Sequence, residues 1–190
     1  MTKRITISTL DAMKASGDKF VMITAYDATF ARLASEAGAE TILVGDSLGM
    51  VLQGHETTIP VSLDAMAYHT ECVARARPHS LIVADLPFMS FSNADDTLHA
   101  STRLMQAGAQ MVKLEGGTWL SDSIHRLVER GVPVCAHLGL TPQSVNVFGG
   151  YRVQGRTPKE AKSILADAVE IQDAGASLLV LECIPAELAA

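Results

Sequence analysis

The chain has 190 residues, of which 48 % are hydrophobic and 19 % charged, and its formal net charge is −6. This length is enough for one substantial hydrophobic core, and the composition excludes an intrinsically disordered chain. The acidic balance argues against nucleic acid or an anionic membrane surface as a partner, and no apolar segment is long enough to span a membrane.

Short apolar runs alternate with amphipathic stretches along the chain, a pattern typical of parallel strands connected by helices. Three junctions contain Ala-Gly-Ala, in which glycine ends a helix, and an acid follows seven or eight residues after each of these glycines. The expected strands are 20–26, 41–46, 81–85, 111–115, 132–137 and 177–182. The expected helices are 28–37, 62–76, 93–107, 119–130 and 158–173.

Polar residues at the ends of these strands are the candidate functional groups. Parallel strands covered by helices bury their middles, but their carboxyl ends open on one face, where barrels and open α/β sheets place ligands. We therefore expect five side chains to converge there: Asp46, Asp85, Glu115, His137 and Glu182. Crowded carboxylates repel one another, so a cation or shared protons must compensate them. Hard oxygen ligands, without a cysteine cluster or a His-Glu-x-x-His helix, favour magnesium over zinc.

Six segments resemble a known family in their order and content: VGDSLGM, ADLPFM, VKLEGG, HLGLTPQSVN, FGGYRVQGR and LLVLEC. The chain is similar to the ketopantoate hydroxymethyltransferases from about residue 4 to its last residue. The resemblance implies an α/β fold of the (β/α)8 TIM barrel class that uses Mg²⁺. It also implies transfer of a hydroxymethyl group from 5,10-methylenetetrahydrofolate to 3-methyl-2-oxobutanoate, giving 2-dehydropantoate for pantothenate and coenzyme A synthesis. Members of this family are homo-oligomers, decamers in the well-known bacterial form.

The resemblance also implies roles for individual residues. Asp46 and Asp85 are expected to hold the metal, with Glu115 as a direct or water-mediated ligand. Ser47 and Lys113 are expected to take the carboxylate of the substrate. The full set of residues expected to contact the substrate is Asp46, Ser47, Asp85, Lys113 and His137.

Glu182 is the expected proton acceptor and follows the apolar run 178–181. A carboxylate near apolar walls can have its pKa raised towards the working pH, which suits removal of a proton from C3 of the 2-oxo acid. A 2-oxo acid can chelate magnesium through its carboxylate and ketone oxygens, and the ion then stabilises the enolate.

Several of these residues have a simpler explanation as structural groups. Lys113 could be a solvated strand residue, although alternation places it on the same side as Glu115. His137 could be a core histidine, and Ser47 could cap a helix. Asp27 ends the first run and either takes part in the chemistry at the carboxyl ends of the strands or has a structural role, and the structural role is favoured.

Two loops carry weaker expectations. Residues 49–58 are either a lid or an ordered loop. Arg152 and Arg156 either contact the glutamate tail of folate or are surface charges, and the surface explanation is slightly favoured.

Six βα units account for residues 1–190 as a single domain, whereas a closed barrel has eight units and typically about 250 residues. We therefore expect the last two units to be absent, and the sequence to be part of a longer chain, because six strands leave two sheet edges exposed.

Two other functions compete with the transferase. One is a magnesium-dependent 2-oxo acid lyase of the isocitrate lyase type, although no Lys-x-Cys-Gly loop is present. The other is a non-catalytic truncated barrel.

The cellular location is predicted to be cytoplasmic, because the first 20 residues lack the apolar centre of a signal peptide. The three cysteines, Cys72, Cys135 and Cys183, are an odd number without C-x-x-C spacing. We therefore expect reduced and mostly buried thiols.

Overall fold

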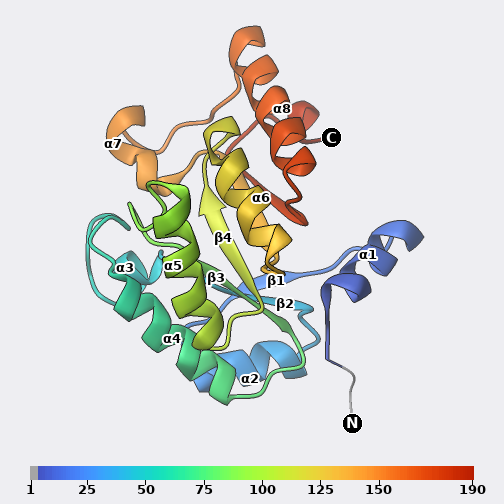
Figure 1. The fold of residues 1–190 in the computed structure, drawn as a ribbon, viewed down its shortest axis with the longest axis vertical. Helices are drawn as coiled ribbons and strands as arrows, with labels where there is room; N and C mark the ends of the chain where they lie inside the picture. Colours follow the sequence, from blue (N-terminus) through green and yellow to red (C-terminus); the bar gives the residue numbers. More distant parts are fainter. Residues whose placement is uncertain (1–3) are drawn as a thin grey trace.

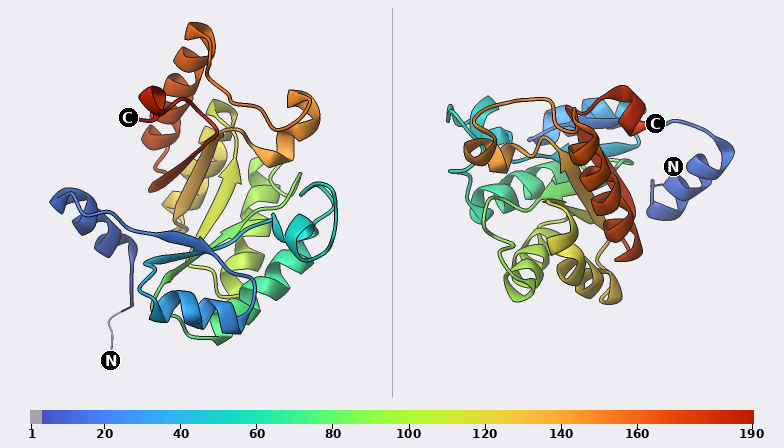
Figure 2. Two further views of the ribbon diagram at one scale, coloured as in Figure 1. Left: turned by 180° about the vertical axis from the view of Figure 1, so that it is seen from behind. Right: turned by 90° about the horizontal axis from the view of Figure 1, so that it is seen from above.

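The computed structural model describes residues 4–190 and contains one six-stranded parallel sheet curled into a half-barrel (Figures 1 and 2). The strands follow the chain order, and each pairs in parallel with the next. They are β1 (Met22–Thr24), β2 (Thr41–Val44), β3 (Leu81–Asp85), β4 (Met111–Glu115), β5 (Val134–Gly139) and β6 (Leu178–Glu182). All six predicted strands are confirmed, and β1 and β6 form the two edges.

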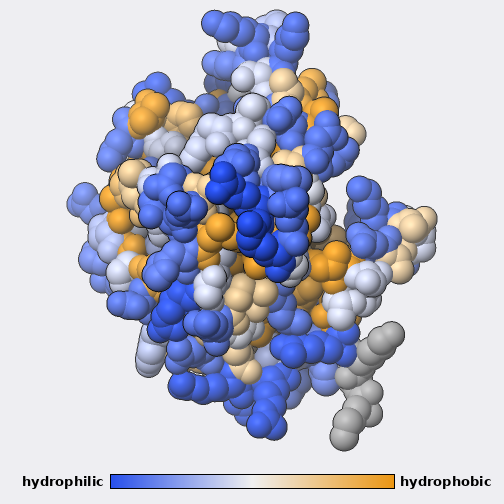
Figure 3. Space-filling model, viewed as in Figure 1, coloured by the Kyte–Doolittle hydropathy of each residue, from blue (hydrophilic) through white to orange (hydrophobic). Residues whose placement is uncertain are grey.

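Helices connect and flank the strands, and five of them cover the convex face of the sheet. The helices are α1 (Ile7–Ser16), α2 (Ala28–Glu36), α3 (Leu48–Val51), α4 (Leu63–Arg75), α5 (Ala94–Gln106), α6 (Ser121–Glu129), α7 (Val145–Phe148), α8 (Pro158–Asp173) and α9 (Ala186–Ala189), with 3₁₀ turns at Thr118–Leu120 and Pro142–Ser144. Of these, α2, α4, α5, α6 and α8 pack side by side on that face, and the outer surface over α4–α6 is mostly hydrophilic in Figure 3. The five predicted helices are therefore confirmed.

Local sequence signals explain where the helices begin and end. Asp27 caps α2, since its Oδ1 accepts hydrogen bonds from the backbone N–H groups of Thr29 and Phe30 at 2.7 and 2.9 Å. The glycines of the three Ala-Gly-Ala junctions all have positive φ, a backbone conformation that commonly ends an α-helix and that glycine adopts easily. The φ values are 95° for Gly38, 111° for Gly108 and 105° for Gly175. A role for Asp27 in the chemistry at the carboxyl ends of the strands is not supported, because its carboxylate caps the N-terminus of α2.

The central strands β2 to β5 bury nearly all of both faces, which is why they read as continuous apolar runs, whereas the edge strands β1 and β6 are partly exposed. One set of side chains, including Ile82, Val112 and Ala136, packs under the helices. The other set lies inside the half-barrel and consists of Leu81, Val83, Met111 and Cys135, all at most 1 % exposed. We call these four residues the lumen floor. Ile5 and Ile7 pack against them at the amino end of the strands.

Some boundaries and environments differ from the predictions. β2 ends at Val44, so Asp46 lies in the turn after the strand, and α1 was not predicted because Leu10 is its only buried residue. Within 49–58, part of α3 is followed by turns, and Thr58 is buried.

The thiols are free, but the expectation of mostly buried cysteines is wrong for Cys183. Only Cys135 is buried, Cys72 is intermediate, and Cys183 is exposed just after the edge strand β6. No helix within residues 4–190 is long and apolar enough to cross a membrane.

Candidate active site

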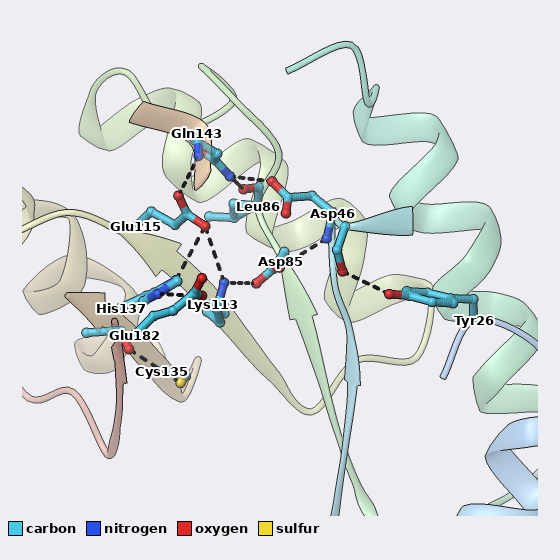
Figure 4. A network of polar contacts seen from close by, with 12 residues as sticks. Tyr26, Asp46, Asp85, Leu86, Lys113, Glu115, Cys135, His137, Gln143 and Glu182 are labelled. Carbon is cyan, nitrogen blue, oxygen red and sulfur yellow. Dashed lines mark hydrogen bonds and ion pairs between the residues drawn. The ribbon is translucent and has the colours of Figure 1, made fainter. Parts of the chain in front are cut away.

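The predicted convergence of polar strand ends is confirmed in the structure. Asp85, Glu115 and Glu182 are the last residues of β3, β4 and β6. Strand register places Asp85 beside Lys113, and Glu115 beside His137. Figure 4 shows these side chains meeting at the carboxyl end of the half-barrel, which we call the rim.

Asp46 and Asp85 lie in direct contact at the rim although 39 residues separate them. The backbone N–H of Asp46 donates a hydrogen bond to Asp85 Oδ2 at 3.1 Å. Gly45 avoids a close approach to Ser47, because a Cβ atom there would lie 3.0 Å from Ser47 Oγ, whereas its distance of 3.4 Å from Asp85 Oδ2 would be close to an ordinary contact. The apolar strand β2 is followed by the charged residue Asp46 because Asp46 contacts polar partners at the rim.

Lys113 provides the cationic group inside the carboxylate cluster. Its Nζ donates to Asp85 Oδ1 at 2.6 Å and lies 3.7 Å from Glu115 Oε1. The solvated alternative for Lys113 is wrong, since the residue is only 4 % exposed. Burial alone would lower the pKa of the ammonium, but Asp85, Glu115 and Asp46 raise it above its usual value, so Lys113 stays charged.

The cluster keeps an excess of negative charge. Asp46, Asp85 and Glu115, all at most 5 % exposed, carry three formal charges against one on Lys113, which leaves two. Burial and the neighbouring Asp85 raise the pKa of Asp46 to about 7. Burial also raises the pKa of Asp85, although Lys113 opposes this shift. These shifts express the cost of holding uncompensated carboxylates in a low-dielectric site.

His137 lies between two carboxylates. Its Nδ1 is 3.4 Å from Glu115 Oε1 and its Nε2 is 3.4 Å from Glu182 Oε2, but neither contact is a well-aligned hydrogen bond. Burial would lower the pKa of this imidazole, but the two carboxylates outweigh that effect and raise it. Burial alone would raise the pKa of Glu115, but His137 and Lys113 outweigh this effect, so the pKa of Glu115 is lowered.

Glu182 is the most accessible acid of the rim, with 41 % of its side chain exposed. The predicted enclosure by apolar walls is therefore not found. The physical reason is that β6 is an edge strand, so one side of Glu182 has no neighbouring strand.

Ser47 begins α3, but its side chain makes no capping hydrogen bond. Instead, its Oγ lies 2.8 Å from the hydroxyl of Tyr26. The sequence pattern did not predict a role for Tyr26, and burial raises the pKa of its phenol. Arg152 and Arg156 are exposed, in agreement with the surface explanation.

Gln143 is the residue that no pattern singled out. It lies in the turn Pro142–Ser144 after β5 and is 6 % exposed. Its side-chain Nε2 donates to Asp46 Oδ2 at 2.8 Å and to the Leu86 carbonyl at 2.9 Å. Its backbone N–H donates to Glu115 Oε2 at 3.0 Å (Figure 4).

The donor set of the rim suits a hard divalent cation. Within residues 4–190, no three His, Cys, Asp or Glu side chains group closely enough to hold a metal ion. Mg²⁺ commonly binds one or two carboxylates and takes its remaining ligands from water and substrate, so Asp46 and Asp85 fit it. Both oxygens of Asp85 and both oxygens of Glu115 already contact protein groups, whereas Asp46 Oδ1 accepts no hydrogen bond within residues 4–190.

Sequence comparisons with known proteins identify the family. The sequence profile of the ketopantoate hydroxymethyltransferases matches residues 4–190. Two similar relatives, both called 3-methyl-2-oxobutanoate hydroxymethyltransferase, come from Saccharophagus degradans and Marinobacter nauticus. The first is 55 % identical over 190 residues, covering 100 % of this chain and 70 % of the relative. The second is 59 % identical over 186 residues, covering 98 % and 70 %.

Solved structures with the same fold are much more distant in sequence. A phosphonopyruvate hydrolase in complex with oxalate and Mg²⁺ has a TM-score of 0.70 at 16 % identity, covering 93 % of this chain and 62 % of that one. A 2,3-dimethylmalate lyase of the PEP mutase/isocitrate lyase superfamily has a TM-score of 0.65 at 17 % identity, covering 93 % and 63 %. This similarity shows the fold alone, whereas the profile and the close relatives decide the family. The chain belongs to the ketopantoate hydroxymethyltransferase family.

Proposed function

We propose that the chain carries the site that transfers a hydroxymethyl group from 5,10-methylenetetrahydrofolate to 3-methyl-2-oxobutanoate, giving 2-dehydropantoate. Family membership and the names of the close relatives support the reaction. The observation that carries the assignment of the site is the meeting of Asp46, Asp85 and Glu115 around Lys113 at one rim.

Asp46 and Asp85 are the proposed Mg²⁺ ligands, and Glu115 acts through water. When bound, Mg²⁺ supplies Lewis-acid stabilisation of the negative charge that develops on the keto oxygen of the substrate. The two formal negative charges left after pairing with Lys113 match one divalent cation.

Lys113 and Ser47 are the proposed partners of the substrate carboxylate. An ammonium has three donors, and Asp85 takes one of them at 2.6 Å, so Lys113 can still donate to the substrate. The hydrogen bond with Tyr26 orients the Ser47 hydroxyl. His137, between Glu115 and Glu182, supplies a further polar contact at the inner wall.

Glu182 is the proposed proton acceptor. Its carboxylate removes the proton from C3 of the keto acid, and the resulting carbanion equivalent attacks the one-carbon unit of the folate. Both C–N bonds to the transferred carbon break, and one water supplies the hydroxyl group, so that a hydroxymethyl group remains on C3. The second proton of the water and the proton taken from C3 end on the two nitrogens of tetrahydrofolate.

Family membership also supports three broader proposals: a (β/α)8 TIM barrel to which the described half-barrel contributes six units as one domain, assembly into a homo-oligomer of the decameric type, and cytoplasmic location. Sedimentation velocity of the purified protein tests the assembly, since a decamer and a monomer sediment very differently.

The function is tested with 3-methyl-2-oxobutanoate deuterated at C3. With Mg²⁺, loss of deuterium to water is expected, and addition of methylenetetrahydrofolate should give 2-dehydropantoate. Exchange without a folate-dependent product would favour the lyase alternative, and the absence of both would overturn the proposal.

A further inference from the structure

Gln143 makes hydrogen bonds to groups at the ends of three strands. Its side-chain amide nitrogen joins Asp46, after β2, to the carbonyl of Leu86, after β3. Its backbone N–H holds Glu115, at the end of β4. One residue of the β5 loop therefore fixes two carboxylates of the rim relative to each other.

The two hydrogen bonds of the side chain use both protons of a single amide nitrogen. Because Nε2 is held on one side by the rigid backbone at Leu86, it defines where Asp46 Oδ2 must lie. Among the hydrogen bonds of residues 4–190, Asp46 Oδ1 has no protein donor, so this oxygen is left for another partner. Orientation of a ligating carboxylate by such an outer hydrogen bond is a general feature of metal sites.

The chemical type of the side chain matters as much as its reach. A lysine or arginine at this position would neutralise Asp46 and weaken the attraction for a cation. A glutamate would place another negative charge 2.8 Å from Asp46 Oδ2. A neutral donor orients the carboxylate and leaves the excess charge of the cluster unchanged.

We propose that Gln143 is a positioning residue that holds Asp46 and Glu115 in the geometry required for binding a divalent cation. The inference rests on the proposed function, because it takes Asp46 as a metal ligand. Gln143 touches neither reacting atom in this scheme and acts only through the two carboxylates.

The test is the affinity of the 190-residue chain for Mn²⁺, used as a spectroscopic probe of the Mg²⁺ site and measured by electron paramagnetic resonance without substrate. Gln143→Met removes the amide at nearly constant volume and keeps the backbone N–H that binds Glu115. The Kd for Mn²⁺ should rise about 10- to 100-fold. Saturating Mg²⁺ should restore the kcat of Gln143→Met for deuterium exchange to the wild-type value. The concentration of Mg²⁺ that gives the half-maximal rate should stay higher than in the wild type.

Gln110→Met is the matched control. The Gln110 side chain is also partly buried and makes a hydrogen bond to a strand, accepting from the backbone N–H of Ile82 at 3.2 Å, but it lies at the amino end of the sheet. This variant should lose a similar amount of thermal stability and keep the wild-type Kd for Mn²⁺. Gln143→Asn, which keeps an amide one methylene shorter, is the second variant and should also bind Mn²⁺ more weakly.

The outcomes separate the two proposals. If the wild type binds Mn²⁺ and both Gln143 variants bind it equally well, the positioning role is overturned and the proposed function stands. If the wild type binds no Mn²⁺, the proposed metal site fails and this inference fails with it. Loss of the fold in both Gln143 variants would assign the residue to stability and would also overturn the inference.

Discussion

The lumen floor and the rim are built from the same strands and the same face of each strand, yet they differ in almost every physical property. On β3, Val83 and Asp85 are two residues apart, and on β4, Met111 and Glu115 are four apart. The floor side chains need no partners beyond apolar contacts. Each rim side chain needs a donor, a counter-charge or a ligand, because a buried charge is costly unless it is paired.

The difference shows how one scaffold divides stability from function. The floor, together with the layer under the helices, supplies the burial that holds the strands in register. The rim uses that register to bring Asp46, Asp85, Lys113 and Glu115 together at a cost in free energy, visible in the raised pKa of Asp46. Substitutions at the two levels should therefore have separable effects.

The largest expected effect is from Asp85→Ala, compared with Val83→Ala on the same strand and face. Asp85→Ala should lower metal-dependent exchange by about 1,000-fold or more, because it removes a proposed ligand and the partner of Lys113. Val83→Ala should cost about 2 kcal/mol of stability and leave the exchange rate of the folded protein unchanged. Exchange is followed by proton NMR in D₂O, and stability by urea denaturation. Equal exchange rates in the two variants would remove the functional distinction between floor and rim.

A second test separates binding from chemistry within the rim. Glu182→Gln should bind the keto acid with near wild-type affinity but exchange its C3 proton about 100- to 10,000-fold more slowly. Glu187→Gln, at an exposed position of α9, is the control and should behave as the wild type. Calorimetric titration measures binding, and NMR measures exchange. Normal exchange in Glu182→Gln would exclude this residue as the proton acceptor.

Much of this architecture could be predicted from the residues alone. Apolar runs and Ala-Gly-Ala junctions predicted six strands and five helices because burial on both faces leaves a strong local pattern. The meeting of Asp46 with Asp85 followed from the common direction of parallel strands. These features depend on the strand to which a residue belongs, and local sequence carries that information.

The remaining features depend on contacts that local sequence does not encode. Gln143 is buried only because the loop after β5 folds over the rim, and nothing in its spacing marks this. The apolar neighbours of Glu182 suggested enclosure, but exposure at an edge strand depends on the sheet as a whole. α1 was missed because it buries only Leu10.

The cost of the rim should also be visible in the pH dependence of stability. The pKa of Asp46 is about 7 in the folded protein, above its ordinary value of 3.8, so its contribution to stability is complete below about pH 4 and is lost as the pH rises through 7. Without divalent metal, raising the pH from 5.5 to 8 should therefore cost the wild type about 2 kcal/mol more than Asp46→Asn. Urea denaturation at the two pH values measures this difference. The same pH dependence in both proteins would contradict the raised pKa.

The smallest expected effect is a difference in alkylation rate between the thiol of Cys135 in the lumen floor and the thiol of Cys183 at the rim. Burial raises the pKa of the Cys135 thiol in the floor to about 12, whereas Cys183 is exposed at the rim. Iodoacetamide at pH 8 should therefore alkylate Cys183 well before Cys135, since the thiolate is the reactive form. Mass spectrometry of peptides from a time course checks the order. Early modification of Cys135 would show that the floor opens in the native state.

The central claim is that carboxylates from distant strands share one divalent cation at the rim. A crystal structure of the protein with Mn²⁺ and 3-methyl-2-oxobutanoate tests it most directly. We predict oxygens of Asp46 and Asp85 at about 2.1 Å from the ion, with the keto acid chelating the same ion. An ion bound elsewhere, or a keto acid bound away from Asp46 and Asp85, would contradict the claim.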